Sequence, residues 1–338
     1  MRKVKISIVL CIVMLVMIAC SKNNEEVINE TEEVHVYPFT GLETNEDVNH
    51  RAVAVMVSNQ VQARPQSGLT KADIVYEMLT EGNITRFMAI YHSDKPEVVG
   101  PIRSAREYFV DLANDMDAVY IYSGAANFVN DLIDEKGIEH IEADQYAADG
   151  TPFLRETFRK SPHNLYMKFS ELPAFLKREE VDMDVTHKPL SFLDDDTEIE
   201  GEEANYVKIS YYKSDPIVEY TYDEKTEKYS RYNDGEITDE LESEIPIEID
   251  NLLVVEAEHE VIDKELRRSI NLHSGGKGYL FQRGKVQEVE WKNQDGNIVP
   301  MIDGEVVPFV TGKTWVNVVQ TEPEKGVKEQ VHYSNDGK

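Results

Sequence analysis

The chain has 338 residues, of which 41% are hydrophobic and 29% charged, so it is long enough for two domains of ordinary size. Asp and Glu number 64 against 35 Lys and Arg, which gives a formal net charge of −29. A chain this acidic repels phosphate backbones, and this excludes nucleic-acid binding through a broad basic surface. The composition also excludes collagen-like chains, disulfide scaffolds and wholly disordered proteins.

The first twenty residues have the pattern of a bacterial export signal with a lipid attachment site. Three basic residues among the first five precede about fourteen mostly apolar ones, fewer than the roughly 20 that a membrane-spanning helix needs. The sequence MIAC at residues 17–20 resembles a lipobox, in which Cys20 takes a diacylglycerol group and the signal is cut before it, although Met is less usual than Leu at the first position. We therefore predict a signal peptide at residues 1–19 and lipidation of Cys20. The alternative is an uncleaved N-terminal helix with a chance Cys.

A lipid on Cys20 has consequences for location and chemistry. The other cysteine, Cys11, leaves with the signal, so the exported part keeps no thiol for a disulfide, a nucleophile or a metal site. The expected location is the extracytoplasmic face of the cell membrane. Residues 20–35 are polar and acidic, and we expect a flexible tether that spans roughly 20 Å.

The segment 36–190 mixes strand and helix signals, and we expect an N-terminal α/β domain. Ser104 is the expected N-cap of its first helix, and Gly137 is the expected end of its second. The expected strands are 51–59, 73–79, 84–92 and 119–123, and the expected helices are 104–118, 127–136 and 170–178.

An acidic stretch at 191–204 predicts a solvated linker, since its spacing does not fit a calcium-binding EF-hand loop. Residues 205–322 then carry short β-rich runs separated by Gly-containing turns, which predict a β-rich C-terminal domain with a curved sheet or partly open barrel. Residues 323–338 are expected to be a polar tail. The predicted fold class is mixed α+β. The runs are 206–212, 218–222, 228–232, 251–258, 278–283, 286–292 and 314–319.

No complete catalytic motif is present. The chain has no HExxH and no GxSxG, and its nine His residues include no pair at metal-ligand spacing. We therefore predict no cofactor and no metal site, and we assign no catalytic residue.

The motif GPIRSAR at residues 100–106 is the most informative stretch. A helix N-terminus carries unpaired N–H groups and partial positive charge, so Arg103 and Arg106 beside Ser104 are unfavourable there unless an anion lies near. Two explanations stay open. The arginines bind an anionic ligand, or they pair with internal carboxylates such as Glu77 and Glu81 and brace the fold.

Two further polar groups are candidates for the same site. Glu77 and Arg86 lie on opposite arms of the expected hairpin and could pair across strands. His163 and Asn164 are residue types that donate to a ligand, or that bind backbone in an Asx-type turn. The predicted ligand-binding set is Arg86, Arg103, Ser104, Arg106, His163 and Asn164, with Glu77 as a possible acid or base.

An ordered series of motifs runs along the chain: RPQSGL at 64–69, ADIVYE at 72–77, ITRF at 84–87, GPIRSAR at 100–106, PHN at 162–164 and GKTW at 312–315. This series resembles the YerB-like lipoproteins, from about residue 40 to 322. This resemblance implies a two-part domain of unknown function, found in lipoproteins of Gram-positive bacteria and tethered to the membrane. It supplies no reaction and no catalytic residue. Where the family more often has Gly-Gly, this chain has Gly82-Asn83.

These observations favour a non-catalytic lipoprotein that binds or regulates at the cell envelope. Its expected partner is an envelope protein or an anionic cell-wall fragment. The alternative is a peptidoglycan-modifying enzyme that uses Glu77 with Arg103 and Arg106. A solute-binding lipoprotein is less favoured, because the second half is β-rich instead of repeating the first.

Overall fold

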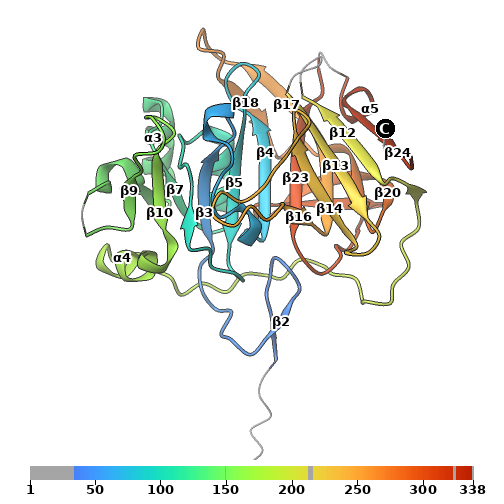
Figure 1. Ribbon diagram of the computed structural model, residues 1–338, viewed down its shortest axis with the longest axis horizontal. Helices are drawn as coiled ribbons and strands as arrows, with labels where there is room; N and C mark the ends of the chain where they lie inside the picture. Colours follow the sequence, from blue (N-terminus) through green and yellow to red (C-terminus); the bar gives the residue numbers. More distant parts are fainter. Residues whose placement is uncertain (1–33, 149, 212–215, 323–324, 337–338) are drawn as a thin grey trace, which may run out of the picture. The chain divides into compact units, whose positions relative to one another are not determined.

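The computed structural model describes residues 34–148, 150–211, 216–322 and 325–336. The chain from His35 onward forms one compact unit, and strands from both halves of the sequence enter the same 13-stranded sheet (Figure 1). The predicted signal, Cys20 and most of the predicted tether lie outside the described residues.

The first half of the described chain forms ten strands and three α-helices. Its strands are β1 (His35–Val36), β2 (Glu43–Thr44), β3 (Val53–Ser58), β4 (Ile74–Leu79), β5 (Thr85–Tyr91), β6 (Val98–Val99), β7 (Val119–Tyr122), β8 (His140–Glu142), β9 (Phe153–Arg155) and β10 (Leu165–Lys168). Its helices are α2 (Glu107–Asp115), α3 (Asn127–Lys136) and α4 (Leu172–Arg178), with 3₁₀ turns η1 (Val61–Ala63), η2 (Leu69–Lys71), η3 (Ala143–Tyr146) and η4 (Phe169–Glu171).

The second half is built almost wholly of strands. They are β11 (Glu202–Glu203), β12 (Tyr206–Ser210), β13 (Ile217–Asp223), β14 (Lys228–Asn233), β15 (Glu236–Ile237), β16 (Glu248–Ile249), β17 (Asn251–Val261), β18 (Arg268–Asn271), β19 (Gly276–Gln282), β20 (Lys285–Gln294), β21 (Asn297–Ile302), β22 (Glu305–Val306), β23 (Thr314–Gln320) and β24 (Val331–Ser334). One short helix, α5 (Val327–Gln330), precedes β24.

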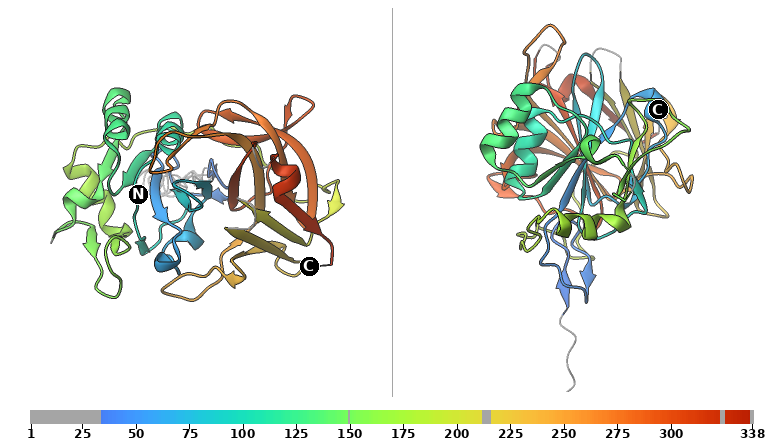
Figure 2. Two further views of the ribbon diagram at one scale, coloured as in Figure 1. Left: turned by 90° about the horizontal axis from the view of Figure 1, so that it is seen from above. Right: turned by 90° about the vertical axis from the view of Figure 1, so that its left-hand side faces the viewer.

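The two halves join where β23 pairs in parallel with β4, with Trp315 opposite Val75. Beyond this seam the large sheet continues through β5, β3, β7 and β8 on one side, and through β17, β19, β20, β21 and β22 on the other. Seen from above, the part of the sheet that contains β17, β19, β20, β21 and β22 is strongly curved (Figure 2, left). A separate six-stranded sheet contains β12, β13, β14, β15, β16 and β24.

Each face of the large sheet has its own hydrophobic core. One core joins alternate residues of β3 and β5 to α4 and to the six-stranded sheet, through side chains such as Phe175 and Tyr220. The other joins the intervening residues to α2 and α3, through side chains such as Phe109 and Val129. Both faces of β3, β4 and β5 are thus covered, which explains why every residue of these strands is buried.

Most expected elements are present, with shifted ends. The hairpin of residues 73–92 is β4 and β5, and the second expected helix is α3, which ends at Gly137 with φ of 64°. The expectation that Ser104 caps a helix beginning there is wrong: α2 begins at Glu107, and Arg106 is its N-cap without a side-chain cap. The backbone before it is extended because the N–H of Arg103 donates to Met56 of β3 and that of Ala105 donates to Gly124.

The fold is mixed α+β and rich in β-strand. The predicted linker contains β11, which pairs with β20, and Phe192 forms a bridge to Phe309. The predicted polar tail contributes α5 and β24, which pairs with β12. Among the described residues, no helix is both long enough and apolar enough to cross a membrane.

Candidate functional site

A cleft of about 800 Å³ opens where β3 ends and β5 begins. Three segments line it: residues 59–64 after β3, residues 83–85 at the turn from β4 into the start of β5, and residues 158–163 between β9 and β10. Pro216 and Asp234 of the second half complete the lining. The cleft therefore lies between the two halves of the chain, at the end of the central strands marked by the cross-strand pair Ser58 and Arg86.

The lining is cationic, although the whole chain carries −29. Arg64 forms an ion pair of 2.9 Å with Asp234, the one acidic residue of the lining. Arg159 donates instead to uncharged groups, at 2.5 Å to the Pro65 carbonyl and 2.8 Å to the Tyr166 hydroxyl. Among the described residues, Asp234 is the one carboxylate of the lining and pairs with Arg64, and no ion pair is formed by Arg159 or by the exposed Lys160. These two cations are therefore available to an anion.

Arg103 and His163 extend this cationic region. No described residue forms an ion pair or a hydrogen bond with the Arg103 side chain, and its Nε is buried. The Nδ1 of His163 is also buried and has no partner among the described residues. Burial lowers the pKa of His163, and the charges of Arg103 and Arg159 lower it further. The neutral ring keeps one nitrogen that donates and one that accepts.

Arg86 and Arg106, also predicted as ligand-binding residues, converge on a carboxylate of the protein itself. Arg86 is 1% exposed and donates to Glu81 at 3.0 Å and to the Ser104 carbonyl at 2.9 Å. Arg106 forms a second ion pair with Glu81. Burial alone would raise the pKa of Glu81, but the two guanidinium charges outweigh it and lower that pKa to about 2. This geometry favours the bracing explanation for Arg86, Ser104 and Arg106.

Asn164 serves its own hairpin. Its side-chain oxygen accepts from Arg155 at 2.8 Å, and its amide donates to the Glu156 carbonyl at 3.2 Å. It does not line the cleft, whereas its neighbour His163 does. The structure thus divides the predicted ligand-binding set: His163 lines the cleft, and Arg103 lies close enough for its charge to act on His163.

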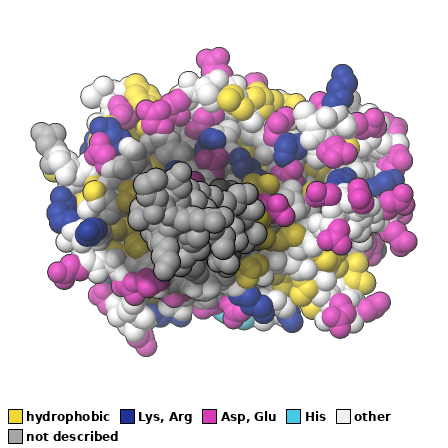
Figure 3. All heavy atoms as spheres, turned by 90° about the horizontal axis from the view of Figure 1, so that it is seen from below, with side chains coloured by type: hydrophobic (Ala, Val, Ile, Leu, Met, Phe, Trp, Pro, Cys, Tyr) yellow, Lys and Arg dark blue, Asp and Glu magenta, His cyan; other side chains and the backbone are white. Residues whose placement is uncertain are grey.

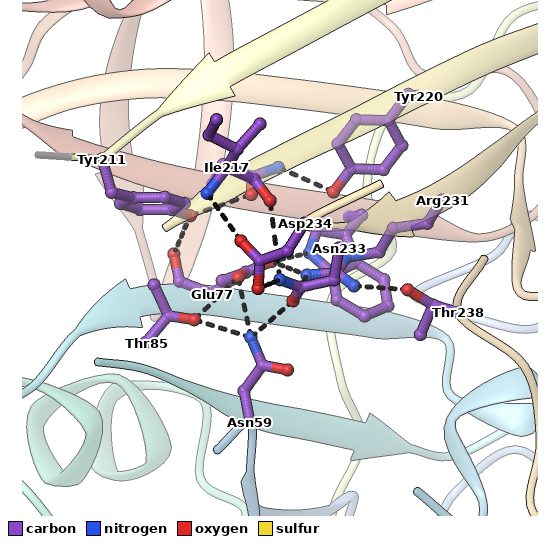
Figure 4. A network of polar contacts seen from close by, with 12 residues as sticks. Asn59, Glu77, Thr85, Tyr211, Ile217, Tyr220, Arg231, Asn233, Asp234 and Thr238 are labelled. Atoms are coloured by element: carbon purple, nitrogen blue, oxygen red, sulfur yellow. Dashed lines mark hydrogen bonds and ion pairs between the residues drawn. The ribbon is translucent and has the colours of Figure 1, made fainter. Parts of the chain in front are cut away.

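Glu77, the predicted acid or base, lies at the centre of a buried polar network (Figure 4). One carboxylate oxygen accepts from Thr85 at 2.9 Å and Asn59 at 3.3 Å. The other accepts from Arg231 at 2.9 Å and from the Trp315 indole at 3.1 Å. Neither Glu77 nor Arg231 has any exposed side-chain surface. The carboxylate has two donors on each oxygen, an arrangement that holds strands of both halves together.

The network also forms the floor of the cleft. Asn59 and Thr85 line the cleft and donate to Glu77 beneath it. Asn233 accepts from both Asn59 and Arg231, which connects the cleft floor to β14. A ligand in the cleft would touch Asn59 and Thr85 and would not reach Glu77.

The cations that sequence reasoning missed are Arg64, Arg159 and Lys160. Arg64 stands first in the RPQSGL motif, and Arg159-Lys160 directly precedes the SPHN segment at 161–164. Two adjacent cations beside a His-Asn pair are unusual in a chain of this charge, and this signal could have marked the site. Within the described ranges, no cluster of three or more His, Cys, Asp or Glu is arranged to hold a metal ion.

Comparison with known proteins places the chain in a family. Family models described as the N-terminal and C-terminal domains of "Protein of unknown function (DUF3048)" match residues 39–182 and 207–316. The "Putative lipoprotein YerB" of Bacillus subtilis (strain 168) is 41% identical over 313 residues, which cover 92% of this chain and 93% of that protein. The chain belongs to the DUF3048 family.

The solved structures agree with this DUF3048 assignment. The crystal structure of the YerB protein from Bacillus subtilis matches with a TM-score of 0.80 and 41% identity, covering 89% of this chain and 99% of that chain. The resemblance to YerB-like lipoproteins is thereby confirmed. The two matched segments correspond to the two halves that meet at the β4–β23 seam.

Proposed function

We propose that this protein is a non-catalytic binding lipoprotein of the cell envelope, which holds an anionic group of a cell-wall fragment in the cleft between its halves. The observation that carries the proposal is the pair Arg159 and Lys160, two cations without a described carboxylate partner in a chain of charge −29. Arg159 is fixed by main-chain carbonyls and a hydroxyl, so its charge is positioned without being neutralised.

The charge of the surface favours anion binding at unpaired cations, and this cleft holds two of them. The face of the molecule seen from below carries Asp and Glu across its width, with Lys and Arg between them (Figure 3). An anion is repelled by such a surface and attracted where the cations stand unpaired. The volume of about 800 Å³ lies within the range of small-molecule sites, which suits a fragment with a carboxylate or phosphate better than a whole protein surface.

Binding can be tested on the compact unit of residues 35–338, because it contains every described element and most of it corresponds to the crystallised Bacillus relative. Calorimetric titration uses two probes, muropeptides from digested peptidoglycan and inorganic pyrophosphate. We expect Arg159→Gln to weaken binding at least tenfold. Arg178→Gln, which removes the same charge from α4 outside the cleft, serves as the control. Equal affinities in both variants, or no binding of either probe, would refute the site.

The membrane anchor is a separate part of the proposal. Its support is the lipobox-like sequence before Cys20 and the lipoprotein name of the Bacillus relative. Full-length Cys20→Ser should leave the membrane fraction of the producing cell, and the wild-type chain should carry a diacylglycerol mass at its first residue. An unprocessed Met1 terminus on the wild-type protein would contradict the anchor.

A further inference from the structure

A second cleft, of about 550 Å³, lies at the other end of the central strands. The cross-strand pair Val53 and Tyr91 lies at this end. Val53 is five residues along β3 from Ser58, which lies at the end with the cationic cleft. At about 3.3 Å per residue, the two ends of β3 are about 17 Å apart. The wall facing these strands comes from η4, α4 and residues 181–183, so the second cleft shares no lining residue with the first.

The second cleft is apolar where the first is polar. Eight of its fifteen lining residues are hydrophobic, and most of these belong to the core that joins β3 and β5 to α4. Leu172 and Leu176 face it from successive turns of α4, and Phe169 stands at the helix entrance. A well-formed apolar cavity with a few polar groups at its rim is the usual form of a small-molecule site.

Two histidines complete the interior without adding charge. The rings of His50 and His92 are stacked with centroids 4.0 Å apart. Burial, and then the neighbouring His50 and His187, lower the pKa of His92 to about 3, and burial also lowers that of His50. His92 therefore stays neutral at ordinary pH and presents a flat ring to the cavity.

The rim, in contrast, carries uncompensated positive charge. Two charged residues of the cleft lining form ion pairs with residues outside the cleft: Arg51 with Asp117, and Asp94 with Lys71. Lys95 and Lys177 are exposed and form no ion pair with any described residue. The charge of Lys95 contributes to the lowered pKa of His50, so this ammonium lies near the histidine wall. Glu180 is the one acidic residue of the described lining that forms no ion pair, so the two lysines outnumber it.

We propose that this second cleft binds a fatty acid, with its aliphatic chain between α4 and the β3–β5 pair and its carboxylate at Lys95 and Lys177. The apolar interior supplies affinity for the chain, and the two unpaired ammonium groups select an anionic head over a neutral one. The residues involved are distinct from those of the cationic cleft, so the two proposals stand or fall separately.

The test is a chain-length series of octanoate, decanoate and dodecanoate, titrated below micelle-forming concentrations into residues 35–338. We expect each added methylene to tighten binding by up to about fourfold. Dodecanol, which has the same chain without the charge, should bind at least tenfold more weakly than dodecanoate. Lack of dodecanoate binding, or equal binding of the alcohol, would overturn the proposal.

Variants at the exposed rim separate this site from the other without disturbing the core. Lys95→Glu combined with Lys177→Glu should weaken dodecanoate binding at least tenfold and leave pyrophosphate binding unchanged. Lys160→Glu, the same charge change in the cationic cleft, should weaken pyrophosphate binding and leave dodecanoate binding unchanged. Flotation with phosphatidylglycerol vesicles tests a different occupant. Capture by vesicles without binding of free dodecanoate would assign the surface to a membrane and refute the fatty-acid site.

Discussion

The carboxylate of Glu77 and the guanidinium of Arg231 lie 2.9 Å apart, and neither side chain has any exposed surface. They come from β4 and β14, 154 residues apart in the sequence. Burial alone would lower the pKa of Arg231, but Glu77 and the nearby Tyr220 raise it above its ordinary value. The pair links the large sheet to the six-stranded sheet.

Removing one partner of this pair should cost more than removing both. Glu77→Gln leaves Arg231 buried without a counter-charge, and we expect a loss of about 3–5 kcal/mol in the free energy of unfolding, measured by urea denaturation. The double variant Glu77→Leu with Arg231→Met replaces the pair by apolar groups, and we expect it to be more stable than either single variant. A cost below about 0.5 kcal/mol for Glu77→Gln would show that the network does not join the sheets.

The indole of Trp315 contributes a charge-assisted hydrogen bond to the same carboxylate. Trp315→Phe removes this donor and should cost about 2 kcal/mol, since hydrogen bonds to charged groups contribute more than neutral ones. Trp291 is the matched control, because its indole donates to the neutral carbonyl of Glu256 at 2.7 Å. Thermal unfolding of both variants should show the larger loss for Trp315→Phe. The opposite order would contradict the larger contribution assigned to the hydrogen bond from Trp315 to Glu77.

Glu81 should support the fold only while it is ionised. Its folded-state pKa of about 2 lies below the ordinary 4.5, so its contribution is complete above about pH 4.5 and is lost as the pH falls towards 2. Glu81→Gln should therefore cost about 3 kcal/mol at pH 7, and the gap to wild type should close in acid. The control is Glu171→Gln, which breaks an exposed pair with Lys168 and should cost under about 0.5 kcal/mol. A pH-independent gap would exclude the ion pairs as its cause.

Local patterns in the sequence predicted local structure well. Short β-rich runs indicated β3, β5 and β13, and Gly137 indicated the end of α3, because these signals depend on near neighbours. The start of α2 was missed, since its preceding residues are held extended by strands distant in sequence. The parallel pairing of β4 with β23 joins residues about 240 apart, and no local pattern encodes it.

The same limit applies to the candidate sites. The sequence indicated that Arg103 and Arg106 of GPIRSAR need anions. In the structure Glu81 pairs with Arg106, and with Arg86 of β5, while Arg103 has no described partner. Which arginine meets which carboxylate depends on the tertiary fold. The cationic cleft assembles Arg64, Arg159 and Asp234 from three separate segments, so motifs could indicate some of its residues but not that they meet in one cleft.

The histidines around the apolar cleft predict a stability that rises with pH. Burial lowers the pKa of His92 to about 3 and that of His187 to about 4, below the ordinary 6.5. Between about pH 6.5 and 4 the unfolded chain binds protons that the folded chain does not, and each histidine destabilises the fold by up to about 1.4 kcal/mol per pH unit. The Nε2 of His187 accepts the N–H of Ala52 at 3.0 Å, so a proton there would break this bond.

Urea denaturation from pH 7 to 4.5 measures this slope. His92→Gln keeps a donor for the His50 carbonyl, which His92 contacts at 3.0 Å, and removes one titrating group. We expect the variant to lose stability less steeply than wild type as the pH falls, while the exposed control His332→Gln follows the wild-type slope. Parallel slopes for all three proteins would show that His92 binds a proton equally well in the folded and unfolded chain, and that the ring at the wall of the apolar cleft is open to solvent.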